Sequence, residues 1–121
     1  MPEELISMLR KWHCVPVATV SKDGIPNVAG KSVMVPDDET IVWGELYFMK
    51  SYENIKQNPV ASICVWDDDT TKAYKVNSTV ELHEEDEFAS RMDEAHRRGH
   101  AKAGVPIHES RGGRLAAVIF K

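Results

Sequence analysis

Apolar positions in the first twelve residues repeat with the period of a helix. Leu5, Leu9 and Trp12 stand at i, i+4 and i+7 and so share one face. Pro2 and two acidic residues open the segment and two basic residues close it, an order that the helix dipole favours. We therefore expect an N-terminal helix that Trp12 docks on the body of the protein.

From residue 15 onward the pattern is that of extended strands. Runs rich in β-branched residues are separated by clusters of Asp, Gly and Pro. The turn Lys22-Asp23-Gly24 joins the first two runs into a hairpin. The sequence predicts strands over residues 15–20, 25–35, 40–44, 60–66, 72–83 and 114–120.

Two further helices are predicted between these strands. Ser51 is the expected N-cap of the first, and Pro59 forces it to stop by Asn58, which leaves about two turns. The second covers residues 85–98 with apolar residues on one face, and Gly99 is expected to end it.

The order of these elements predicts a mainly β fold. Antiparallel hairpins with helices inserted late favour a small barrel over a doubly wound sheet, because no strand-helix-strand crossover repeats. The Gly-rich fingerprint of a dinucleotide fold is absent from the sequence. No repeat or linker divides the chain, so residues 1–121 are taken as one folding unit.

Composition narrows the class of protein. With 42% hydrophobic and 28% charged residues in 121, the chain has the make-up of a soluble globular domain. The net charge of -4 gives no pull toward nucleic acid or an anionic membrane. The longest apolar run, 115–120, is far short of the ~20 residues that span a bilayer. We expect a cytoplasmic protein in which Cys14 and Cys64 are buried free thiols.

The residues best suited to bind a ligand stand together at the start of the short predicted helix. Lys50 and Ser51, with Asn54 three residues further on, combine a positive charge, a hydroxyl and unpaired backbone N–H groups at one point. A phosphate monoester needs this combination, although a capped helix with a solvated lysine would look the same. A second cation, Lys31, lies mid-strand between Gly30 and Ser32, and the glycine suggests close approach by a backbone or ligand.

Other chemistries have weaker support in the sequence. His96 and His100 stand at i, i+4, but the helix is expected to end between them, and no carboxylate completes a metal site. Neither cysteine has the local pattern of a nucleophile, so both are read as small core residues. No metal is expected, and no catalytic residue can be named.

Taken together, three segments resemble the FMN-binding split-barrel family typified by pyridoxamine 5'-phosphate oxidase. They are the hairpin turn Asp23-Gly24-Ile25-Pro26, the block 49–59 that ends in Asn-Pro, and the apolar strand 60–66 that runs toward a Trp. The resemblance covers roughly residues 5–82, with the last strand also where the family has one.

The resemblance implies a Greek-key split barrel of about six antiparallel strands with two to three peripheral helices. It also implies a homodimer with FMN in two equivalent sites at the subunit interface. Carried over to this chain, the cofactor-binding residues are Lys50 and Ser51 on the phosphate, with Asn54 in support, Lys31 and Ser32 on phosphate and ribityl, and the backbone of Trp43, Gly44, Glu45 and Leu46 along the flavin ring.

The chain departs from the family's namesake at one end. True pyridoxamine 5'-phosphate oxidases continue past the last strand into a basic, Trp-containing segment, whereas this sequence stops at Lys121. We therefore expect a minimal FMN-dependent oxidoreductase rather than a vitamin B6 oxidase. The alternatives are an FMN carrier or electron shuttle, a split barrel that binds the deazaflavin F420, and a barrel used only for dimerisation or partner binding. The resemblance implies no functional residue within residues 83–111.

Overall fold

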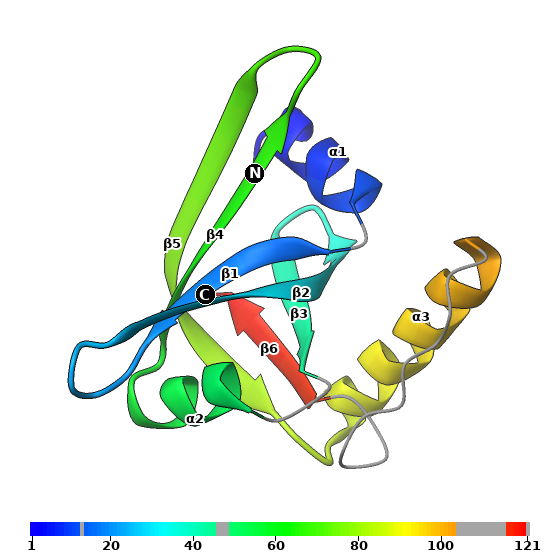
Figure 1. Ribbon diagram of the computed structural model, residues 1–121. Helices are drawn as coiled ribbons and strands as arrows, with labels where there is room; N and C mark the ends of the chain where they lie inside the picture. The colour runs from blue at the N-terminus through cyan, green and yellow to red at the C-terminus, as the bar shows by residue number, and fades with distance from the viewer. Residues whose placement is uncertain (13, 46–48, 104–115, 121) are drawn as a thin grey trace.

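The computed structural model describes residues 1–12, 14–45, 49–103 and 116–120, with backbone alone over 100–103 (Figure 1). These residues form three helices and six strands. In chain order the elements are α1 (Glu3–Lys11), β1 (Val15–Val20), β2 (Pro26–Asp37), β3 (Thr40–Glu45), α2 (Lys50–Gln57), β4 (Val60–Asp67), β5 (Lys72–His83), α3 (Glu87–Ala103) and β6 (Ala116–Phe120).

The strands close into an antiparallel barrel in the order β1-β2-β3-β6-β5-β4. β1, β2 and β3 form a meander, while β6 enters between β3 and β5, as Figure 1 shows in red. The chain therefore leaves the meander after β3, crosses to pair β4 with β1, and returns to β3 only with its last strand. The predicted mainly β barrel with peripheral helices is confirmed.

Alternation along the strands creates two apolar layers. The barrel interior is filled by side chains from several strands, such as Val17, Trp43 and Ile63, all at most 1% exposed. Neighbouring positions point outward, and Val42 packs with Met92 in a second cluster between the barrel and α3. A shift of one residue along a strand therefore moves a side chain from the barrel interior to the face that α3 covers, because successive side chains point to opposite faces.

The helices differ from expectation at three points. Trp12 does not dock α1, since it is 39% exposed and follows the last helical residue, and α1 is instead anchored by buried residues such as Leu9. Ser51 is not the N-cap of α2, because the helix begins at Lys50 after Met49. Gly99 does not end α3, which continues to Ala103.

The strands match expectation closely, and most differences are at their ends. β1 and β5 have the predicted bounds, whereas β2 and β4 continue further, to Asp37 and Asp67. The described part of the last strand begins at Ala116, and residues 114–115 lie outside the described residues. Gly24 has a φ of +84° in the predicted hairpin turn, a conformation that glycine adopts readily.

Candidate functional site

Most of the predicted site residues come from three neighbouring elements, β2, β3 and α2. Ser32 on β2 lies opposite Gly44 on β3, so the two strand segments run side by side. α2 packs against β1 and β2 at the same part of the barrel. The side chains nevertheless form three separate groups with Lys50 apart from them, and Leu46 lies outside the described residues.

The first group is an ion pair inside the barrel. The Nζ atom of Lys31 lies 3.1 Å from Oε1 and 3.4 Å from Oε2 of Glu45. Glu45 is 0% exposed. The indole N–H of Trp43 donates to the same carboxylate over 3.3 Å. Alternation explains the group, because positions 43 and 45 share the inward face of β3.

This ion pair changes the expected role of Lys31. A buried carboxylate needs a partner charge, and the ammonium group of Lys31 fills that role. A phosphate brought to Lys31 would also approach the negative charge of Glu45. Lys31 therefore helps to hold Glu45 and Trp43 in place. Of the two lysines, Lys50 is the better candidate to bind a phosphate.

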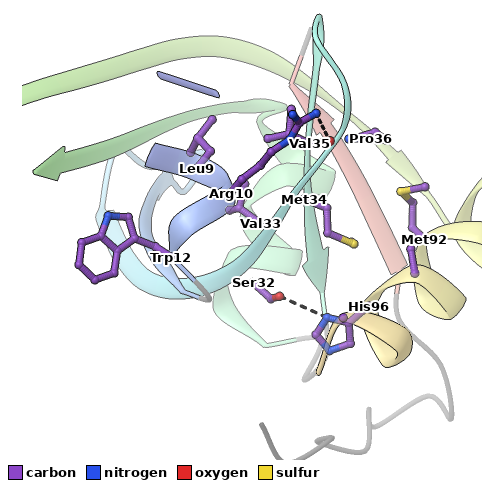
Figure 2. A pocket seen from close by; sticks show the side chains of 12 residues that line it. Leu9, Arg10, Trp12, Ser32, Val33, Met34, Val35, Pro36, Met92 and His96 are labelled. Atoms are coloured by element: carbon purple, nitrogen blue, oxygen red, sulfur yellow. Dashed lines mark hydrogen bonds between the residues drawn. The ribbon is translucent and has the colours of Figure 1, made fainter. Parts of the chain in front are cut away.

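The second group faces outward, toward α3. Ser32 follows Lys31 and points to the other side of the sheet, where its Oγ lies 3.2 Å from Nδ1 of His96. Figure 2 shows this hydrogen bond at the edge of a cavity of about 370 Å³ between α1, β2 and α3. In the sequence, His96 stands out only as a metal-ligand candidate with His100, and no local pattern connects it with Ser32.

The third group anchors α2. Asn54 is 2% exposed and its amide donates to the Thr19 hydroxyl of β1 over 3.0 Å. Ser51 is equally buried, and its Oγ accepts a hydrogen bond from the Asn27 amide at the start of β2 over 3.3 Å. These contacts fix where the helix begins relative to the barrel, so both residues position α2.

Lys50 is the accessible cation of the predicted set. It is the first residue of α2, its side chain is 58% exposed, and its Nζ lies 3.9 Å from Glu53. No side chain among the described residues caps this helix, so its first-turn N–H groups keep hydrogen-bonding capacity at the positive end of the helix dipole. A positive charge and hydrogen-bond donors suited to an anion therefore coincide at the start of α2.

Tyr52 is a neighbouring group that the sequence analysis did not single out. Its hydroxyl donates to Glu84 over 2.6 Å, and this bond, with burial, raises the pKa of Tyr52 to about 12. The side chain therefore joins α2 to the segment after β5 as a neutral phenol. No sequence signal connects residues this far apart.

Gly30 marks a close approach, as the sequence suggested, but the neighbour is a side chain of this chain. A Cβ atom built on Gly30 would lie 2.7 Å from Sγ of Cys14. Cys14 is exposed and Cys64 is half-buried, so the expectation that both thiols are buried is wrong. The glycine makes room for a thiol on the outer face of the sheet.

Two further features bear on function: groups of metal-binding side chains and helices that could span a membrane. None of their His, Cys, Asp and Glu side chains gather in a group of three or more that could hold a metal ion. No helix in the described part of the chain is both long and apolar enough to cross a membrane.

Comparison with known proteins places the chain in a family. A family model described as pyridoxamine 5'-phosphate oxidase matches residues 1–119. The chain belongs to this family. Family membership confirms the resemblance seen in the sequence, and one solved relative, from Nostoc punctiforme, is named as an FMN-binding protein. No curated protein matches the sequence.

Three solved structures show the range of the pyridoxamine 5'-phosphate oxidase fold. A putative pyridoxamine 5'-phosphate oxidase from Lactobacillus delbrueckii is 28% identical, with a TM-score of 0.73 and coverage of 99% of this chain and 88% of that one. A protein named F420 reductase is 22% identical, with a TM-score of 0.74 and coverage of 99% and 94%. HutZ, a heme storage protein from Vibrio cholerae, is 20% identical, with a TM-score of 0.65 and coverage of 98% and 88%.

Proposed function

We propose that this protein is a flavoprotein that binds FMN and transfers electrons or hydride through it to a partner or substrate. The observation that carries the proposal is the exposed Lys50 at the start of α2, which no side chain among the described residues caps, in a chain of the pyridoxamine 5'-phosphate oxidase family. A phosphate monoester fits there because a cation coincides with first-turn N–H groups at the positive end of the helix dipole.

The remaining predicted residues have supporting roles in this proposal. Ser51 and Asn54 hold the start of α2 against β1 and β2, which keeps Lys50 in place. Lys31 and Trp43 hold Glu45 in the barrel, next to the β3 backbone at Gly44 along which the flavin ring is proposed to lie. When bound, FMN supplies the redox chemistry, and the chain binds and orients it.

Heme is a third candidate group, because one solved neighbour is named as a heme storage protein. Heme iron is held by a protein side chain such as His, Cys, Met or Tyr. Of the five histidines in the sequence, the structure describes the side chains of His83, which bonds carboxylates through both ring nitrogens, and His96, which is 4% exposed. FMN is the proposed group because the family match and a solved relative named as FMN-binding support it, with the deazaflavin F420 as the alternative.

A homodimer is part of the same proposal. Large apolar side chains are exposed on the outer side of β2 and β4, with Val28 67% exposed and Trp66 48% exposed. A second copy covering them would remove apolar surface from water, which favours association. Size-exclusion chromatography with light scattering tests the assembly, and a monomer at micromolar concentration would contradict it.

The first experiment is the visible absorption spectrum of the purified protein after incubation with FMN and desalting. We expect the two flavin bands and release of FMN on heating. A deazaflavin spectrum would replace FMN with F420, a Soret band would replace it with heme, and a colourless protein that ignores all three would overturn the proposal. Steady-state oxidation of NADH or NADPH by the holoprotein then separates an enzyme from a carrier.

Lys50→Ala tests the phosphate assignment, with Lys56→Ala as the matched control on the same helix. Loss of a half-exposed, charge-assisted contact should weaken FMN binding by about tenfold. The control removes an equal charge near the other end of α2 and should leave the FMN dissociation constant unchanged. If both variants weaken FMN binding equally, the effect of Lys50 comes from the net charge of the protein and not from a direct contact with the phosphate.

A further inference from the structure

The cavity between α1, β2 and α3 is a candidate ligand site. Of the described residues that line it, Ser32 alone belongs to the predicted cofactor-binding residues. Its volume of about 370 Å³ is within the range of small-molecule sites in proteins. Its wall is mostly apolar, with Leu9 from α1, Val33 and Met34 from β2, and Met92 from α3 among the lining residues. Three separate elements therefore line this cavity, which is open to solvent on one side (Figure 2).

Polar groups lie at two ends of this cavity. Arg10 donates to the Val35 carbonyl oxygen over 3.3 Å, and the Ser32 hydroxyl bonds His96. Because Ser32 and Val35 are three residues apart on one strand, the two polar ends are separated by about 10 Å at ~3.3 Å per residue. Met34 lies between them in Figure 2.

The two ends differ in charge. Arg10 is the only permanently charged side chain among the described residues that line the cavity, and its contact with Asp38 is long, at 3.8 Å, and exposed. At the other end, the Ser32 hydroxyl has one donor and two acceptor positions, so its bond to His96 leaves capacity for a second partner. A ligand that matches both ends has an anion at one end and a hydroxyl or carbonyl at the other.

We infer that this cavity binds a compact, mainly apolar organic carboxylate of about 8–10 Å in length, with the carboxylate on Arg10 and a polar oxygen on Ser32. Binding itself stands on the cavity and needs no flavin. The role of such a molecule as the substrate of this protein rests on the proposed function.

The probes are three naphthalenes that differ by one polar group each. 6-Hydroxy-2-naphthoate matches both ends, 2-naphthoate lacks the hydroxyl, and 2-naphthol lacks the carboxylate. Equilibrium dialysis against the full chain should show saturable binding of one 6-hydroxy-2-naphthoate per chain, with each truncated probe at least fivefold weaker. Absence of binding, or equal binding of all three, would overturn the inference.

Arg10→Gln and Lys11→Gln form a matched pair on adjacent positions of α1. Arg10→Gln should weaken 6-hydroxy-2-naphthoate by about five- to tenfold and leave 2-naphthol unchanged, because only the carboxylate contact is lost. Lys11 does not line the cavity and touches it only through the Trp12 ring, whose centroid lies 5.1 Å from its Nζ, so Lys11→Gln removes the same charge and should change neither. Equal weakening by both variants would reduce the effect to net charge and overturn the assignment of Arg10.

Ser32→Ala tests the other end. This variant should reduce the affinity for 6-hydroxy-2-naphthoate to that for 2-naphthoate, whose own affinity should not change. A drop of equal size for both probes would show a general disturbance of the cavity and contradict the Ser32 contact. Because dialysis is done without FMN, failure here leaves the FMN absorption experiment unaffected, and the two proposals fail separately.

Discussion

The ammonium group of Lys31 lies 3.1 Å from the carboxylate of Glu45, and the two residues face each other from adjacent strands inside the barrel. The side chain of Lys31 is 13% exposed and that of Glu45 is 0% exposed. Removal of either charge alone would leave the other in this largely buried site without its opposite charge.

Lys31→Met should therefore destabilise the protein by about 2–4 kcal/mol, measured as the free energy of unfolding in urea. The double variant Lys31→Met/Glu45→Gln removes both charges and keeps an oxygen acceptor for the Trp43 N–H, so it should lose less than Lys31→Met alone. A double variant that is less stable than the single one would contradict a charge-based explanation. Lys72→Met, at the exposed pair with Glu4, is the control and should change little.

Asn54→Leu should separate α2 from β1. The buried amide donates to the Thr19 hydroxyl, and its loss leaves that hydroxyl without its partner at a cost of about 1–3 kcal/mol. If α2 positions Lys50, the affinity for FMN should fall together with stability. Asn77→Ala breaks an exposed bond to Ser62 on the outer sheet and should affect neither quantity.

The stability of the protein should depend on pH through His83. Burial lowers the pKa of its ring, but the hydrogen bonds to Asp86 and Glu81 outweigh burial, and the net pKa is raised. A raised folded-state pKa adds stability that is fully present below the unfolded value of about 6.5 and is lost as the pH rises through the folded value. Urea unfolding from neutral to alkaline pH should show this loss, and His83→Gln should remove it.

Gly30→Ala tests the close approach of Cys14. The added methyl group would overlap the thiol, which must rotate toward solvent, and we expect a loss of about 1 kcal/mol. Cys14→Ala in the same chain should restore most of this loss, as measured by thermal unfolding. If the double variant is no more stable than Gly30→Ala, the backbone rather than the thiol limits the space at this position.

Local patterns predicted the strands well, but they did not predict which side chains contact the candidate site residues. β1 and β5 were predicted to the residue because apolar alternation and turn residues act over short distances. Gly99 was expected to end α3, but one glycine costs about 1 kcal/mol in a helix, which packing of the helix can offset. Ser51 has the chemistry of an N-cap, yet its hydroxyl is used by Asn27 from a distant strand.

The unpredicted contacts share one physical cause. Lys31 meets Glu45, and Ser32 meets His96, only after β2 has its register with β3 and α3 has packed on the barrel. Sequence patterns define which face a residue takes but not its partner across the fold. The apolar and turn patterns predicted the elements and the family resemblance predicted the split barrel, whereas the structure was needed to show that Lys31 is already paired.

The place of β6 between β3 and β5 also has a consequence for synthesis of the protein. Ile41 pairs with Phe120, and Val80 pairs with the same residue from the other side. While the chain is still emerging from the ribosome, β3 and β5 therefore expose unpaired edges, which can pair with other chains. The barrel can close only once β6 is available to pair with both strands, so we expect chains in which β6 has not yet been made to be prone to aggregation.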